Sequence, residues 1–476
     1  MSDRESREPA PVTAAAKVIY RAPMANLVKR LSLPEAIGLS VSVICPTVTA
    51  AFNITLVVQA AGAAAPLAFA IGTVAMALVA LSFMAFTHRV AHAGSAYAYI
   101  SHTFGSRAGF IAGWSLLLTY VGFATGQAAL VGSFTAEALK GVSIDIGSSW
   151  IAIGGGALAV AWWLAFRDMR LAGRLMLGLE AAAMAGILAL CVSVLLQVRP
   201  GLRESAASFQ PSAKFGGWSG LGFAMVFCIL SFGGFEGAAT LGEETHNPRR
   251  NIPIALLFTV IVSGLFFTFV AYCEVIGFGT DGIKALGKSE APLNDLALRY
   301  ASPRLAIALD VAAAVSCFSG MLGPLAAAGR VLFALGRGGL APALGAVHRV
   351  HGTPAPAVAL SAILVIVPFL LWAPFVGAGN YYSYASTIGV LALIGVYISV
   401  GAAETVEAWR EQRFAWSIIS ALGPVLLLWV LYRNVYPVPE FPNNLWPYVA
   451  LAWAAASWGL MKLRPAVARA PLPDYS

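Results

Sequence analysis

Twelve long apolar runs constrain the fold of this chain more than any other feature of its sequence. Each run has about 20 residues or more, which is the length that an α-helix needs to cross the hydrocarbon core of a bilayer. The runs cover residues 35–60, 66–87, 108–136, 148–166, 174–197, 216–242, 252–278, 305–334, 356–376, 382–402, 415–433 and 446–463. Because only helices and closed barrels satisfy their backbone hydrogen bonds in lipid, these runs predict an all-α polytopic membrane protein with twelve transmembrane helices.

Composition and charge distribution agree with this class. Of the 476 residues, 59% are hydrophobic and only 11% are charged, whereas soluble domains have about a quarter of their residues charged. With the N-terminus placed in the cytoplasm, 21 of the 30 lysines and arginines fall on the cytoplasmic side of the predicted membrane. The net charge of +8 is therefore a topology signal with both termini cytoplasmic, and it does not indicate nucleic-acid binding.

Cysteine and histidine positions give no indication of metal or redox chemistry. The five cysteines lie in apolar runs without paired spacing, and the six histidines lie in the polar links between runs. No cofactor, metal site or nucleophile–base pair within the membrane is expected, and so the sequence does not predict an enzyme. The first 30 residues lack the apolar core of a signal peptide.

Two of the apolar runs contain helix breakers near their middle. The first break is at Pro46, among small polar residues, and the second break is at Gly233 and Gly234, shortly before Glu236. Irregular backbone is tolerated at membrane depth where it lines a cavity, and helix ends exposed there attract ions of opposite charge. Interrupted helices at matching positions of two halves are typical of transporter sites. Small residues in membrane helices also simply permit close packing, so this alternative stays open.

Three separated motifs resemble those of the amino acid–polyamine–organocation superfamily. The segment "LSFGGFEGAATLGEETHNPRRNIPIAL" (residues 230–256) is similar to the signature of the sixth helix in that family. The segment "GSAYAYISHTFGSRAGFIAGW" (94–114) resembles the link between the second and third helices. The segment "AAAGRVLFALGRGGLAPALGAVHRVHGTPAPAVAL" (326–360) resembles the exit of the eighth helix.

The resemblance implies a LeuT-like fold with a 5+5 inverted repeat, in which helices 1 and 6 are broken. Residues 31–402 would form the ten-helix transport core, and 403–464 would add two further transmembrane helices. Residues 1–30 and 465–476 would be cytoplasmic tails. The family's activity implies a secondary transporter in the cell membrane that works by alternating access.

The resemblance also implies a substrate site between the two breaks. The substrate carboxylate is expected at the first break, on Ile44, Cys45, Pro46 and Thr47. The amino group is expected at the second break, on backbone carbonyls of Leu230, Ser231, Gly233 and Gly234, with Phe232 and Phe235 beside them. The two phenylalanines would gate or pack the pocket, and Tyr120 of the third run would line it. The family's glycine-serine-glycine is absent from the first break, where Pro46 has no N–H to donate.

Carboxylates within the predicted spans are functional candidates because a charge is costly in the bilayer. Glu236 either carries a coupling proton or braces the second break through backbone N–H groups. Glu180 of the fifth run either partners Ser316 or Ser319 of the eighth run or points towards Arg174. The two serines suit a sodium site, or they bond to their own helix.

Other charged and aromatic groups are expected to be structural. Glu274 and Asp310 lie near the outer ends of predicted spans and are expected at the membrane interface. Tyr381 and Tyr384, at the start of the tenth run, either line the pocket or lie at the interface, and the interface is favoured because tyrosine is enriched there. The segment "GEETHNPRRN" (242–251) is expected to be a charged cytoplasmic turn, because its spacing matches no zinc motif.

The sequence therefore predicts a permease that imports an amino acid or related amine, with H+ favoured over Na+ as the coupling ion. Its partners would be that substrate, the coupling ion and the lipid bilayer, without nucleic acid. An amino acid/amine antiporter is the alternative among transporters, and a transporter-like nutrient sensor is the alternative from another class.

Overall fold

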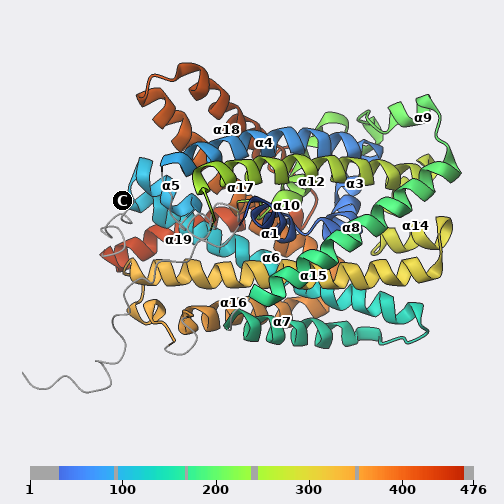
Figure 1. Ribbon diagram of the computed structural model, residues 1–476, viewed down its shortest axis with the longest axis horizontal. Coiled ribbons are helices and arrows are strands. Elements are labelled where there is room, and N and C mark those ends of the chain that lie inside the picture. Colours follow the sequence, from blue (N-terminus) through green and yellow to red (C-terminus); the bar gives the residue numbers. More distant parts are fainter. Residues whose placement is uncertain (1–31, 90–94, 167–169, 237–244, 349–352, 466–476) are drawn as a thin grey trace, which may run out of the picture.

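A computed structural model describes residues 32–89, 95–166, 170–236, 245–348 and 353–465. Within these ranges its regular secondary structure is helical, without β-strands (Figure 1). Nine helical stretches within these ranges are long and apolar enough to cross a membrane. The predicted all-α, multi-pass membrane class is therefore confirmed. The number of twelve spans stays a prediction. The first two runs form the single stretch Pro46–Thr87, the sixth run is described as an apolar helix only over Gly217–Phe232, and residues 446–463 are not among the nine stretches.

The chain around the first break consists of several short helical segments that lead into a long helix. They are α1 (Leu33–Ile44), α2 (Pro46–Val48), the π-helix η2 (Thr49–Asn53), α3 (Ile54–Ala61), the 3-10 helix η3 (Gly62–Ala64) and α4 (Ala65–Arg89). Pro46 is the first residue of α2. Proline suits this position because an N–H in the first turn has no acceptor within the helix, so nothing is lost when it is missing.

The described residues in the middle of the chain contain the helices α5 to α14. Its α-helices are α5 (Ser95–Phe104), α6 (Ser106–Gly141), α7 (Trp150–Phe166), α8 (Arg170–Val198), α9 (Leu202–Ala207), α10 (Gly217–Phe232), α12 (Pro248–Phe278), α13 (Ile283–Leu286) and α14 (Pro292–Tyr300). Short 3-10 turns in the links are η4 (Gly147–Ser149), η5 (Ala213–Phe215) and η6 (Thr280–Gly282).

The C-terminal part contains five further α-helices. They are α15 (Pro303–Arg337), α16 (Ala355–Val376), α17 (Ala378–Arg410), α18 (Phe414–Arg433) and α19 (Trp446–Leu463), with the 3-10 turns η7 (Pro342–Gly345) and η8 (Asn443–Leu445).

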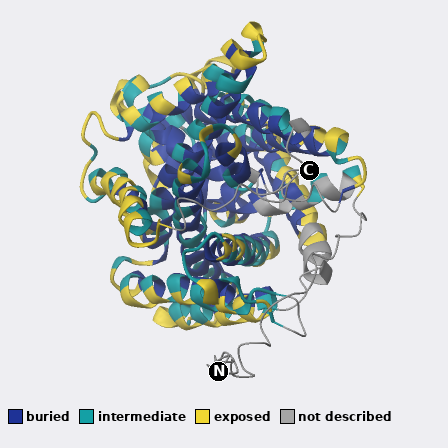
Figure 2. Cartoon of the chain, turned by 90° about the vertical axis from the view of Figure 1, so that its left-hand side faces the viewer, coloured by how far each residue is buried: buried dark blue, intermediate teal, exposed yellow. Residues whose placement is uncertain are grey.

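The long helices lie side by side along the long axis of the molecule. Helix α4 packs against α12, and α6 packs against both α15 and α17 (Figure 1). Buried residues concentrate in the interior of the bundle, and exposed residues lie on its outer helices and at its ends (Figure 2). Large apolar side chains are exposed on the outer helices, such as Leu371 on α16 and Leu451 on α19. An exposed apolar surface of this kind suits contact with lipid.

Helices α6 and α17 approach each other very closely. A Cβ atom on Gly122 would lie 2.6 Å from the carbonyl oxygen of Ala385, so only glycine fits there. The Thr119 hydroxyl of α6 donates to the carbonyl oxygen of Gly389 at 2.9 Å. Small residues and interhelical hydrogen bonds of this kind hold membrane helices together.

Three of the residues expected at the membrane interface are buried within protein. Glu274 and Tyr381 have no exposed surface, and Asp310 is 2% exposed. The side-chain amide of Asn294 in α14 donates to the Asp310 carboxylate, and the Tyr381 hydroxyl lies 2.7 Å from that of Thr125. This burial was not expected from the sequence, and it arises because helix α14 packs against α15 and because α17 packs inside the bundle. The depth of these residues in the membrane stays a prediction.

Candidate functional site

The first break is a change of backbone conformation at one residue. Helix α1 ends at Ile44, and Cys45 has left-handed dihedral angles of φ 52° and ψ 65° before α2 begins at Pro46. This conformation costs a residue with a side chain about 1–2 kcal/mol. The N–H of Val48 donates to the Cys45 carbonyl oxygen at 3.0 Å, whereas the N–H of Thr47 requires a partner from outside its own helix.

Glu180 of α8 supplies that partner. The Thr47 N–H donates to Glu180 Oε1 at 2.7 Å, and the glutamate is only 5% exposed. A carboxylate is favourable at this end of a helix, where unpaired N–H groups point outwards. Of the partners predicted for Glu180, Ser316 lies beside it, whereas the side chain of Arg174 lies outside the described part of the structure. The backbone of the first break was not predicted as a partner.

The serines of α15 also lie at the first break. Ser316 lies beside both Glu180 and Cys45, and Ser319 lies beside Cys45. The Ser316 hydroxyl has no hydrogen-bond partner among the described residues. The structure therefore brings together residues from three separate parts of the sequence: Cys45 and Thr47 of the first break, Glu180 of α8, and both serines of α15.

The second break follows the end of α10 at Phe232. Gly233 has extended dihedral angles of φ −55° and ψ 127°, and Gly234 has φ 102°, which favours glycine. Glu236 is 3% exposed and accepts hydrogen bonds from the Gly234 N–H at 3.1 Å and from the Tyr397 hydroxyl at 2.6 Å. Residues 237–244, which include the start of the predicted charged turn, lie outside the described residues.

Asn53 joins the two broken regions to α17. Its amide nitrogen donates to the Ser231 hydroxyl at 3.0 Å, and its amide oxygen accepts from the Tyr382 hydroxyl at 2.7 Å. The Ser231 hydroxyl in turn donates to the carbonyl oxygen of Phe227 at 2.9 Å. Asn53 and Tyr382 were not among the residues predicted from the sequence, although a lone asparagine inside an apolar run indicates a functional position.

The aromatic residues of the second break pack into the core. Phe232 meets Phe267 with ring centroids 5.3 Å apart, and Phe235 meets Phe83 at 5.5 Å and Tyr397 at 5.6 Å. Both residues have no exposed surface. Of the two roles that the sequence analysis gave them, packing is the one that these contacts fit.

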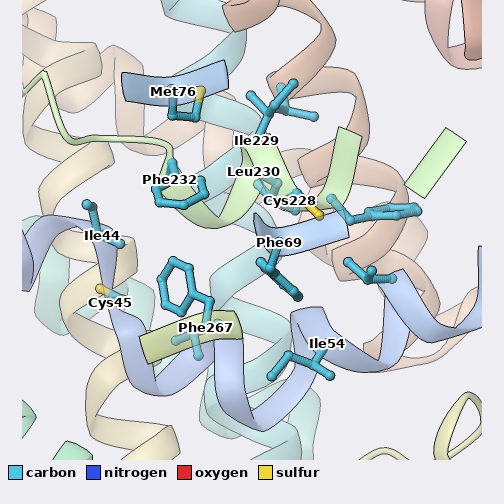
Figure 3. Packing of buried hydrophobic residues seen from close by; sticks show 14 of the residues in the cluster. Ile44, Cys45, Ile54, Phe69, Met76, Cys228, Ile229, Leu230, Phe232 and Phe267 are labelled. Atoms are coloured by element: carbon cyan, nitrogen blue, oxygen red, sulfur yellow. The ribbon is translucent and has the colours of Figure 1, made fainter. Parts of the chain in front are cut away.

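Leu230 and Tyr120 are the last two residues that were predicted to bind the substrate. The Leu230 carbonyl oxygen accepts from the Gly233 N–H at 3.0 Å, and Tyr120 lies within electrostatic range of Glu236. Figure 3 shows Leu230 in the same packed region as Ile44 and Cys45 of the first break. Both breaks therefore contribute residues to the same hydrophobic core.

The electrostatics of this region are dominated by its carboxylates. No lysine or arginine side chain that the structure describes forms an ion pair with Glu180 or Glu236. Among the described residues, no group of three histidine, cysteine, aspartate or glutamate side chains is placed to hold a metal ion. The arrangement offers carboxylate and hydroxyl oxygens to a small polar ligand.

Comparison with known proteins gives a family match and more distant relatives. The family model described as "Amino acid permease" matches residues 31–455. The chain is 26% identical to the branched-chain amino acid permease BcaP of Lactococcus lactis over 354 residues, which covers 70% of this chain and 75% of that protein. It is 27% identical to the low-affinity putrescine importer PlaP of Escherichia coli over 316 residues, with 63% and 66% covered.

Among solved structures, the fold is similar to that of a mutant manganese transporter from Eremococcus coleocola. The TM-score is 0.57 at 13% sequence identity, and the match covers 93% of this chain and 97% of that chain. At this identity the likeness concerns the fold alone.

Proposed function

Because this chain belongs to the amino acid permease family of the amino acid–polyamine–organocation superfamily, we propose that it is a secondary active transporter that imports an amino acid or related amine. The family consists of membrane permeases and not of enzymes. The protein acts in the cell membrane by alternating access, with both termini in the cytoplasm. Residues 31–402 form its transport core, and 403–464 add two helices.

The observation that carries this proposal is the pair of interrupted helical regions with a buried carboxylate at each. Glu180 bonds to the first break, Glu236 bonds to the second, and Asn53 links both regions. Irregular backbone and buried charge are both costly inside a membrane protein, and they occur together where ions and polar substrates pass. The substrate lies between the breaks, next to Thr47 of the first and the backbone of Gly233 and Gly234 of the second.

Protons are the proposed coupling ions, with Glu236 as the group that carries them. Its carboxylate is held by two neutral donors, a backbone N–H and the Tyr397 hydroxyl. A buried carboxylate without a cationic partner is readily neutralised by a proton. The alternative is coupling to sodium, with Ser316 and Ser319 as the sodium site. Uptake under an imposed sodium gradient tests this alternative.

The proposal is tested by uptake into proteoliposomes that contain the purified protein. We expect radiolabelled amino acids or amines to accumulate when an inward proton gradient is imposed, and to stop accumulating when a protonophore removes the gradient. If accumulation instead follows an imposed sodium gradient, then Na+ and not H+ is the coupling ion. The absence of uptake and of exchange across a panel of amino acids and amines would refute the transporter proposal and favour a sensor.

Antiport is separated from symport in the same vesicles. The family relatives include permeases named for amino acids and an importer named for an amine, so exchange of an amino acid for its amine product is the second candidate. Uptake that requires vesicles preloaded with the partner solute would favour antiport. Uptake into empty vesicles would favour symport.

A further inference from the structure

The place expected to bind a substrate carboxylate is already occupied by a carboxylate of the protein. Glu180 Oε1 lies 2.7 Å from the Thr47 backbone nitrogen. This N–H belongs to the first turn of a helical run that continues from Pro46 through η2 and α3 to Ala61. A substrate carboxylate at the same N–H would have to displace Glu180 or lie directly against its negative charge.

Three further polar groups at the first break lack hydrogen-bond partners among the described residues. They are the Thr47 hydroxyl, the Ser316 hydroxyl and the side-chain oxygen of Gln127, whose residues are 0%, 2% and 9% exposed. Both hydroxyls lie beside the Glu180 carboxylate. Buried polar groups usually have a hydrogen-bond partner, and here two such hydroxyls lie beside one carboxylate, so a ligand with several hydrogen-bond donors would suit this place.

Gln127 reaches the same place from α6. A Cβ atom on Gly320 would lie 3.1 Å from Gln127 Nε2 and 3.1 Å from Cys45 Sγ, so the amide group and the first break adjoin each other. Helices α6, α8 and α15 thus surround the first break with side-chain oxygens. No lysine or arginine that the structure describes forms an ion pair with the Glu180 carboxylate there.

The hydrogen-bonding capacity of this cluster matches an ammonium group. A carboxylate and an amide oxygen only accept hydrogen bonds, and a hydroxyl donates or accepts. An ammonium group has three N–H donors and no acceptor, and its hydrogen bonds to a carboxylate are strengthened by charge. A second carboxylate would bring only acceptors and a repelling charge.

We propose that the substrate is an amine with no carboxylate next to its amino group, and that Glu180 selects it by pairing with the ammonium and by occupying the Thr47 N–H. This assignment rests on the proposed transport function and narrows its substrate class. The oxygens of Gln127, Thr47 and Ser316 are the further acceptors for the ammonium.

The test uses substrate pairs that differ only in the α-carboxylate. Putrescine is compared with ornithine, cadaverine with lysine, and isobutylamine with valine, in uptake and competition assays on wild-type proteoliposomes. We expect the amine to be transported about 10- to 100-fold more efficiently than its amino acid in at least one pair, the range of a charge-assisted hydrogen bond. Amino acids transported as well as or better than their amines would overturn this inference and leave the transport function intact. If neither member of any pair is transported or exchanged, the proposed function itself fails.

Variants then assign the selectivity to one residue. Glu180→Gln keeps the shape and an acceptor for the Thr47 N–H but removes the charge, so we expect the ratio of amine to amino acid uptake to fall about tenfold or more. Glu180→Asp retains the charge and is expected to keep the amine preference. Glu137→Gln, on an exposed pair with Lys140, serves as the control that leaves the ratio unchanged. An unchanged ratio in folded Glu180→Gln would remove the selecting role from Glu180, and the wild-type comparison remains decisive for the substrate class if this variant does not fold.

Discussion

Glu180 and Glu236 have the same structural relation to the two breaks, because each accepts a backbone N–H at an interrupted helix. Their remaining surroundings differ. Glu236 also accepts a hydrogen bond from the Tyr397 hydroxyl. Glu180 instead lies beside the Thr47 and Ser316 hydroxyls, which have no other partner among the described residues. At the scale of single residues, this difference divides the roles: Glu236 is the proposed proton carrier, and Glu180 is the proposed contact for the substrate.

Replacement of Glu236 tests the proton role. In Glu236→Gln the side chain keeps its size but no longer binds and releases a proton, so we expect the loss of proton-driven accumulation. Exchange of substrate between equal solutions should remain within about tenfold of the wild type, because it needs no net proton movement. Both are measured in proteoliposomes, with Glu137→Gln as the surface control. Unchanged pH dependence of uptake would remove Glu236 from coupling.

The Asn53 link is a second test at this scale. In Asn53→Leu the Tyr382 hydroxyl loses its partner, and the free energy of unfolding should fall by about 1–3 kcal/mol. The double variant Asn53→Leu/Tyr382→Phe leaves fewer unpaired groups and should lose less than the sum of the two single changes. Thermal unfolding in detergent measures all three. Additive losses would show that the two side chains are not coupled.

The candidate site was predictable in its local features and not in its long-range contacts. Pro46 and the Gly233–Gly234 pair mark breaks because their backbone properties are local. The bond from Thr47 to Glu180 joins residues 133 positions apart, and the bond from Asn53 to Tyr382 joins residues 329 apart. Such pairs follow from the packing of whole helices, which the periodicity of one segment does not encode.

At the scale of elements, the bundle depends on a few close approaches between helices. Gly122 of α6 lies against the Ala385 carbonyl of α17, and Gly264 of α12 lies against the Thr73 side chain of α4. Because apolar side chains gain little by leaving lipid, such contacts supply much of the association between membrane helices.

A matched pair of glycine substitutions tests this packing. Gly122→Ala places a Cβ 2.6 Å from a backbone oxygen, so α6 and α17 must separate, and we expect a loss of about 1–3 kcal/mol of stability. Gly156→Ala on the exposed face of α7 meets no atom within 4 Å, and it should stabilise the protein by about 0.5–1 kcal/mol through helix propensity. Thermal unfolding of the two variants should therefore shift in opposite directions. A Gly122→Ala protein as stable as the wild type would contradict the close contact.

The helical elements themselves followed from the sequence with few exceptions. Long apolar runs fix the existence of membrane helices because hydrocarbon thickness sets their length. The complete burial of the Glu274 side chain was not predicted, because the helices that cover it are distant in the sequence. Depth along one helix is a local property, whereas burial against other helices is not.

At the scale of the whole molecule, the membrane orientation is a testable consequence of the charge pattern. The five native cysteines are buried, so a single introduced cysteine reports its own accessibility. Ser148 lies in the link before α7, and Glu411 follows α17, and both are exposed. With cytoplasmic termini, these two links lie on opposite sides of the membrane.

Thiol labelling of intact cells tests that orientation. We expect Ser148→Cys to react with a membrane-impermeant maleimide from outside, and Glu411→Cys to react only after the cells are permeabilised. The parent protein without these substitutions is the control for labelling of native cysteines. The reverse pattern would show that the chain has the opposite orientation.

In the proposed symport, substrate and protons enter together through the two broken helices. The decisive measurement is the pH outside wild-type proteoliposomes when a transported substrate is added without any imposed gradient. Proton symport predicts an immediate alkalinisation outside, which protein-free liposomes do not show and which Glu236→Gln abolishes. Substrate entry with no pH change, or with acidification outside, would contradict proton symport.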